Sequence, residues 1–186
     1  MKIFFAACVS FGFLACVLSG FVSVRKREIP KNAAPDVQPA QVSAIDGFWL
    51  IRDSDGAPDS VVAVYEKNGA GYFRMVAIFH NGKIDDTIFR PLERSKGIAA
   101  SPYLCSFDFV WNLKIQSDGK YSGRVVDPDD GSVYRCEVWV NGKNKKLVLR
   151  GEVLIFGESE EFEAYDAKKL PFKIDLKSIE PNPPAL

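Results

Sequence analysis

The chain has 186 residues, 47% hydrophobic and 26% charged, which are the proportions of one folded globular domain with flanking segments. Its 24 basic and 24 acidic side chains give a formal net charge of zero. Because binding to a phosphate backbone needs a basic excess, this balance excludes a typical nucleic-acid-binding protein.

Residues 1–24 are predicted to bring the protein to a membrane. A basic start is followed by an apolar or small run over residues 3–24, and then by a basic cluster at 25–27. This pattern is typical of a secretory signal peptide. The run is also long enough to span a bilayer as an uncleaved helix. A third interpretation uses FLAC at 13–16 as a lipoprotein cleavage box that leaves a lipid on Cys16. All three predict export to the periplasm or cell envelope, with or without a retained anchor.

Two flanking segments look too polar to form a core of their own. Residues 25–44 hold three prolines and few apolar side chains, so we expect a disordered linker. Residues 168–186 are predicted to be a C-terminal tail. In this tail Phe172, Ile174 and Leu176 alternate with charged residues, which allows a short docked strand, whereas we expect the last six residues to be disordered.

Residues 45–167 are predicted to be one domain of antiparallel strands. Asn-Gly or Asp-Gly pairs occur at 68–69, 81–82, 118–119, 130–131 and 141–142. Such pairs favour tight hairpin turns, because Asn, Asp and Gly adopt positive φ at little cost. The expected strands are 47–52, 60–66, 72–79, 107–115, 121–127, 132–140, 146–153 and 161–165. The strand at 72–79 is apolar on both faces, so we expect both to be covered.

The expected strand at 107–115 shows the clearest alternation. Its odd positions are all large and apolar, and its even positions are polar except for Val110. This period predicts one buried and one solvated face. Strands of this kind, each beside its sequence neighbour, predict an all-β, up-and-down barrel of about eight strands. A two-sheet sandwich is the alternative.

Residues 89–103 lack alternation and are predicted to form a long surface connection, either a functional lid or a mobile loop.

Aromatic side chains on these strands are the candidate ligand contacts. Small barrels either fill their interior with such side chains or hold one small ligand. The candidate ligand-binding residues are Trp49, Phe107, Phe109, Trp111 and Tyr134. We also expect Trp49 to pack under Arg150 in a cation–π contact that closes one end of the barrel.

Outside residues 1–24, few residues suggest catalytic or metal chemistry. Cys105 and Cys136 are predicted either to form a disulfide or to stay reduced and buried. The single histidine, His80, precedes a turn and is expected at the surface. With one histidine and no cysteine pair at the spacing of zinc ligands, we expect no zinc site. The aspartates cluster at 53–59, 85–86 and 127–130, where we expect turn formation rather than calcium binding. No catalytic residue, metal or cofactor is therefore expected.

Three sequence fragments together resemble a known family. They are Gly47-Phe48-Trp49; a spaced block of Trp111, Gly123, Asp127-Pro128, Gly131, Tyr134 and Cys136; and Leu147-Val148-Leu149-Arg150-Gly151. Over most of residues 45–167 they are similar to the bacterial exported family catalogued as domain of unknown function 2147, a lipocalin-like barrel family. The resemblance implies a small exported barrel in a bacterial envelope, with no catalytic residue to carry over.

These features lead to three functional hypotheses. The first is non-enzymatic binding of a small apolar or amphipathic molecule, such as a lipid-like ligand, inside the barrel. The alternative is a cell-envelope interaction or structural protein with a solid core. A hydrolase-type enzyme ranks third, and the sequence leaves the oligomeric state open.

Overall fold

The computed structural model describes residues 44–153 and 156–185. The predicted signal or anchor segment and nearly all of the predicted linker lie outside these residues. The strands are β1 (Gly47–Arg52), β2 (Pro58–Lys67), β3 (Ala70–His80), β4 (Lys83–Thr87), β5 (Asp108–Ile115), β6 (Tyr121–Val126), β7 (Val133–Val140), β8 (Leu147–Val153) and β9 (Phe156–Ala164). Short 3₁₀ helices are η1 (Leu104–Ser106), η2 (Ala167–Lys169) and η3 (Leu176–Ser178).

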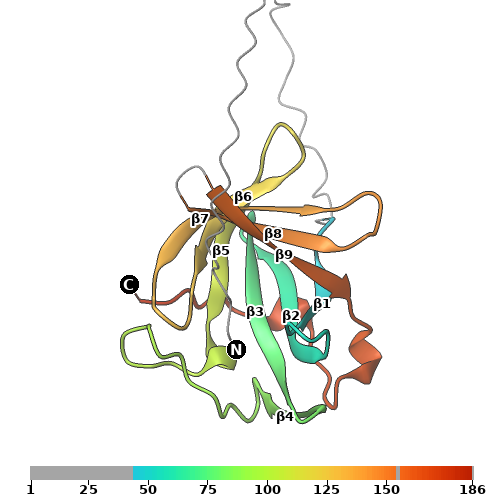
Figure 1. Ribbon diagram of the computed structural model, residues 1–186, viewed down its shortest axis with the longest axis vertical. Coiled ribbons are helices and arrows are strands. Elements are labelled where there is room, and N and C mark those ends of the chain that lie inside the picture. The colour runs from blue at the N-terminus through green and yellow to red at the C-terminus, as the bar shows by residue number, and fades with distance from the viewer. Residues whose placement is uncertain (1–43, 154–155, 186) are drawn as a thin grey trace, which may run out of the picture. The chain divides into compact units, whose positions relative to one another are not determined.

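The strands form a closed antiparallel barrel (Figure 1). The hydrogen-bonded order is β2-β1-β9-β8-β7-β6-β5-β3-β4, and β2 also pairs with β3. This last pairing closes a ring of eight strands, so the barrel prediction is confirmed over the sandwich. The strand β4 pairs only with the far half of β3 and lies outside the ring. The sequence pattern does not predict β4, because its five residues, KIDDT, are few and include two aspartates.

One group of buried side chains lies in the interior of the barrel and is here named the interior cluster. It comprises Ile45, Trp49, Val62, Val64, Phe73, Met75, Ile78, Ile98, Leu104, Cys105, Phe107, Phe109, Val110, Trp111, Leu113, Val126, Cys136, Val138, Leu147, Leu149 and Phe162. The ring of Phe73 meets those of Phe109 and Phe162 edge-on, at centroid distances of 6.1 and 6.3 Å. Burial of each such side chain stabilises the fold by roughly 1.5–3 kcal/mol.

The alternation predicted for β5 holds only in its middle. Asp108, expected to be solvated, is fully buried and makes a bidentate ion pair with Arg74, with both N–O distances 2.9 Å. This pairing compensates the buried charge. Ile115, expected inside, is 61% exposed. The pairing of β5 with β6 is irregular between Trp111 and Lys114, and Asn112 has a φ of 56°, so the end of the strand turns away from the interior.

The outer face of β2 and β3 carries a second apolar group, the outer cluster, formed by Leu50, Val61, Ala63, Tyr65, Val76, Ala77, Leu170 and Ile179. Its last two members come from the C-terminal tail, and Phe172, Ile174 and Leu176 pack against it. The prediction that both faces of β3 are covered is therefore confirmed. The tail docks through irregular backbone and two 3₁₀ helices rather than through a strand.

The prediction that the last six residues are disordered is wrong for Asn182. Its backbone N–H donates to Asp108 Oδ2 at 2.6 Å, and its carbonyl accepts from the Asp108 N–H at 2.9 Å. The Asn182 side chain also donates to the Ser106 carbonyl at 2.8 Å. A partner 74 residues away in sequence holds this segment, and composition alone does not reveal it.

Candidate functional site

The two ends of the barrel differ in how the chain reverses direction. At one end, the turn end, the strands are joined by short turns at residues 68–69, 116–120 and 141–146. At the other, the connection end, lie loop 53–57, turn 127–132 and the long connection 88–107. Of the five predicted turn pairs, only Asn68-Gly69 and Asn81-Gly82 have positive φ at both residues.

The connection is a packed segment of the barrel. Ile98 and Leu104 enter the interior cluster. The Ser95 hydroxyl donates to the Pro128 carbonyl at 2.6 Å, and the same carbonyl accepts from the amides of Lys96 and Gly97. Hydrogen bonds therefore join the connection to the turn 127–132 at this end of the barrel.

Asp86, fully buried on β4, binds the start of the connection. Its Oδ1 accepts from the Leu92 amide at 3.0 Å and its Oδ2 from the Glu93 amide at 2.7 Å. Burial, with this carboxylate beside it, raises the pKa of the Cys105 thiol well above its usual range. The carboxylate thus joins β4 to two separate parts of the connection.

His80, at the end of β3, lies between two carboxylates. Its Nε2 is 2.7 Å from Glu93 Oε1, and its Nδ1 is hydrogen-bonded to Asp85. These bonds, that with Glu93 foremost, raise the pKa of His80. We name these three residues the His80 cluster. With both ring nitrogens bound to carboxylates, the imidazole joins β3, β4 and the connection rather than acting as a poised general base.

Sequence reasoning did not find either partner of His80. Asp85 could have been found, since it follows His80 across the Asn81-Gly82 turn on a paired strand. Glu93 belongs to the connection, and its approach depends on the Asp86 hydrogen bonds.

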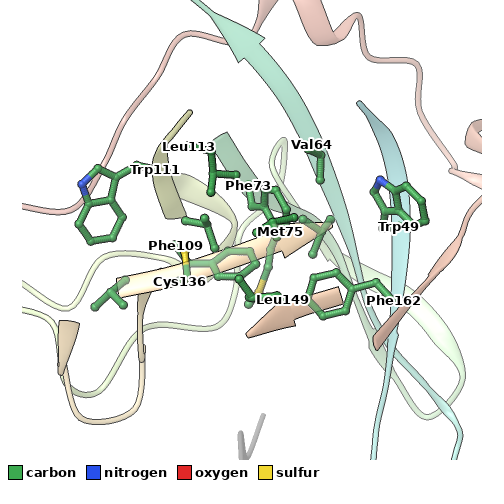
Figure 2. Close-up of a cluster of buried hydrophobic side chains, with 14 of the residues drawn as sticks. Trp49, Val64, Phe73, Met75, Phe109, Trp111, Leu113, Cys136, Leu149 and Phe162 are labelled. Atoms are coloured by element: carbon green, nitrogen blue, oxygen red, sulfur yellow. The ribbon is translucent and has the colours of Figure 1, made fainter. Parts of the chain in front are cut away.

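Four of the five candidate ligand residues, Trp49, Phe107, Phe109 and Trp111, come together in the interior cluster. Figure 2 shows Trp49 and Trp111 on opposite sides of the group. Tyr134 on β7 is half-buried and is not a member. That these side chains bind a ligand stays a prediction.

The expected contact between Trp49 and Arg150 does not form. The Trp49 ring is inside, and its Nε1–H donates to the Ile45 carbonyl at 2.9 Å. Arg150 is exposed on β8, between the inward-facing Leu149 and the buried Gly151. Successive residues of a strand point to opposite faces, so the guanidinium points out of the barrel.

The predicted disulfide does not form either. Cys105 and Cys136 are both buried as free thiols in the interior cluster. Burial raises the pKa of the Cys136 thiol to about 12. Both thiols therefore stay protonated at neutral pH and are weak nucleophiles, as in the reduced, buried alternative.

The aspartates of loop 53–57 and turn 127–132 form turns, as expected, whereas Asp85 and Asp86, also expected in a turn, lie on strand β4. Asp53 accepts from the amides of Asp55 and Ala57, and Asp127 and Asp130 accept from amides two residues ahead.

Within residues 44–153 and 156–185, no group of three or more His, Cys, Asp or Glu side chains is arranged to hold a metal ion. Within the same ranges, no helix is long and apolar enough to cross a membrane.

Comparisons with known proteins agree with this architecture. Residues 47–164 match the family described as "Uncharacterized protein conserved in bacteria (DUF2147)". No curated protein matches the sequence. Among solved structures, protein HP1028 from the human pathogen Helicobacter pylori, described as a member of the lipocalin family, is similar with a TM-score of 0.53 and 16% identity. The match covers 73% of this chain and 97% of that protein. At this identity the likeness shows the fold.

Proposed function

The chain belongs to the bacterial family DUF2147, and from that premise we propose that it is a non-enzymatic binding protein that holds one small apolar or amphipathic molecule in its barrel. The observation that carries this proposal is the closed eight-stranded ring around an aromatic-rich interior. A barrel of this size is just wide enough for side chains or one small ligand.

The interior could adapt to an alkyl chain. Met75 is flexible and polarizable, and Cys136 is small, so neighbouring rings can shift around them. The Phe73, Phe109 and Phe162 rings offer edges and faces to an apolar guest. Ile98 and Leu104 come from the connection, so movement of this segment would uncover the interior at one end.

A non-enzymatic role fits the titratable groups of the connection end. The His80 ring nitrogens are bound to carboxylates, and the thiols of Cys105 and Cys136 have raised pKa values. These groups therefore suit structural roles better than proton transfer or nucleophilic attack at neutral pH.

Quenching of interior tryptophans tests the proposal. In the Trp139→Phe variant, where the tryptophan outside the interior cluster is removed, Trp49 and Trp111 report from two sides of the barrel. A bromine-bearing dodecyl alcohol should quench both, and native mass spectrometry should show one alcohol per chain. Leu149→Phe, which adds a ring inside, should weaken uptake, whereas Ile115→Phe at an exposed site should not. Absence of quenching and of a mass adduct would reject the proposal.

One observation favours a second candidate, an envelope interaction protein with a solid core. Phe89 and Leu92 of the connection are 65% and 49% exposed, and the Phe89 ring contacts Phe172 of the tail at 5.2 Å. This candidate predicts no uptake of any alkyl probe. It also predicts cross-linking to one envelope protein that is lost in the Phe89→Ser and Leu92→Ser variants and kept in Ile115→Ser.

We further propose that residues 1–24 export the protein to the periplasm or envelope, in line with the apolar run and its basic flanks. The intact mass of the protein isolated from cells separates the alternatives. Loss of the leader supports a signal peptide, the full mass supports a retained anchor, and a lipid adduct abolished by Cys16→Ser supports a lipoprotein. Full-length protein in the cytoplasmic fraction would reject export.

A further inference from the structure

Two neighbouring oxygens at the start of β2 are buried without a hydrogen-bond partner among the described residues. They are Asp59 Oδ2 and Ser60 Oγ. Ser60 as a whole is 0% exposed. Buried polar groups in native proteins almost always have partners, so an adjacent pair of orphans calls for an explanation.

The strand register places the Ser60 side chain inside the barrel. Ser60 lies directly opposite Ile51 on β1 and Ile78 on β3. Residues opposite one another on antiparallel strands share a face of the sheet. Ile78 belongs to the interior cluster, and Ile51 packs against it. The Ser60 hydroxyl therefore faces the interior at the connection end.

Asp59 reaches the same place through an irregularity in the strand. Ile51 pairs with Ser60 and Arg52 with Pro58, so Asp59 is the extra residue of a bulge. The Ser60 hydroxyl is close enough to act on this carboxylate as a weak hydrogen-bond donor that lowers its pKa, although burial dominates and raises it. Neither Asp59 Oδ2 nor Ser60 Oγ has a partner at full hydrogen-bond geometry among the described residues.

Among the described residues, the charged groups that act on Asp59 are negative. Asp53 and Glu93 both raise the pKa of Asp59 through charge repulsion. The ion pairs among the described residues do not include Asp59, and the nearby Arg52 guanidinium is bound to Glu163 and the Gly56 carbonyl. The carboxylate only accepts, and the serine oxygen keeps free lone pairs even when its O–H points to Asp59. A positive hydrogen-bond donor is therefore the group that fits both oxygens.

We propose that the ligand is an amphipathic amine, whose cationic head group donates to Asp59 and Ser60 while its alkyl chain lies in the interior cluster. This inference rests on the proposed function, and it names the chemical class of the ligand. An acyl chain with a carboxylate head would meet Asp59, Asp53 and Glu93, so it is disfavoured by like charge.

Three probes of equal chain length and different head group test the inference: dodecylamine, dodecanol and dodecanoate. Each is titrated at neutral pH, below its micellar concentration, into the full-length Trp139→Phe variant, with tryptophan fluorescence and native mass spectrometry as readouts. We expect the amine to bind about tenfold or more tightly than dodecanoate, with dodecanol between them.

Asp59→Asn should remove the preference for the amine and leave dodecanol uptake unchanged. Asp55→Asn, which changes an exposed aspartate in the preceding loop 53–57, should keep the preference. Ser60→Ala should weaken amine binding a few-fold without reversing the order of the probes. The ranking of the three probes on the protein with native Asp59 needs no site variant, so it remains decisive if Asp59→Asn fails to fold.

The outcomes separate the two proposals. Uptake of none of the probes would overturn the proposed function. Uptake of all three with equal affinity, or tighter binding of dodecanoate, would overturn the amine inference and leave the binding function standing. An amine preference that survives in a folded Asp59→Asn variant would also overturn the inference.

Discussion

The turn end and the connection end of the barrel are built from similar residues by different means. At the turn end, Asn68, Gly69 and Gly119 adopt the positive φ that a tight turn needs, and their partners are local. At the connection end, Asp86 and Gly97 act through residues from other elements. The comparison teaches that local backbone preference specifies the turn end, whereas the connection end adds tertiary packing to its local turns and gathers the titratable groups.

The largest difference between the ends is expected when an aspartate that binds backbone amides is removed. Asp86→Ala leaves the part-buried Leu92 and Glu93 amides without their acceptor, and a donor left unpaired in a buried site costs ~1–3 kcal/mol. We expect urea denaturation to show a loss of about 3 kcal/mol in the free energy of unfolding. Asp118→Ala, which removes one exposed amide contact at the turn end, should cost about 0.5 kcal/mol or less. Equal losses would abolish the contrast.

The next largest difference in stability is expected between two glycine substitutions, one at each end of the barrel. A Cβ on Gly97 would lie 2.2 Å from the Asp130 carbonyl carbon, whereas a Cβ on Gly142 meets nothing within 4 Å. Gly97→Ala should therefore destabilise the protein by about 1–3 kcal/mol through overpacking, and Gly142→Ala should change stability by less than about 0.5 kcal/mol. Thermal unfolding followed by circular dichroism measures both. A neutral Gly97→Ala would mean that the connection yields easily.

A substitution at Gly69 probes the turn end itself. Its φ is +73°, and a Cβ there has open space, so Gly69→Ala should cost only the conformational penalty of about 1 kcal/mol. The expected result is a small fall in the urea midpoint with an unchanged slope. A loss as large as that of Asp86→Ala would show that packing also specifies this end.

The smallest effect is expected for His80→Gln, and it should depend on pH. The folded protein holds the pKa of His80 above its ordinary value of 6.5, so the imidazolium stabilises the fold fully below that value. The stabilisation is lost as pH rises through the folded pKa. Because the cluster is partly exposed, we expect about 0.5–1 kcal/mol near pH 6 and a smaller difference from wild type near pH 9. Lys120→Gln, which breaks an ion pair between the turn 116–120 and Glu137 on β7, is the control and should show no such change over this range. A His80→Gln effect that grows with pH would contradict the assignment.

The closed barrel could be predicted because its signals are local. Turn pairs at 68–69 and 118–119, together with the alternation around Phe109 and Trp111, identify strands that pair with their sequence neighbours. The family resemblance, carried by residues such as Trp49 and Gly123, is confirmed by the match over 47–164.

Interactions between distant residues could not be predicted in the same way. Asp108 looks like a solvated strand position, because neither the Arg74 guanidinium nor the Asn182 amide is near it in sequence. His80 looks like a surface residue because Glu93 approaches only after the connection has folded.

From its sequence alone, this protein is specified as an all-β chain whose consecutive strands share a dry face, since side-chain alternation and turn preference act over a few residues. Only the tertiary structure decided that the tail covers the outer face of β2 and β3, that Trp49 and Arg150 stay apart, and that Asp59 Oδ2 and Ser60 Oγ are buried without partners among the described residues. These features depend on which distant groups meet when the ring closes, because a buried charge or donor takes its partner from whatever packs against it.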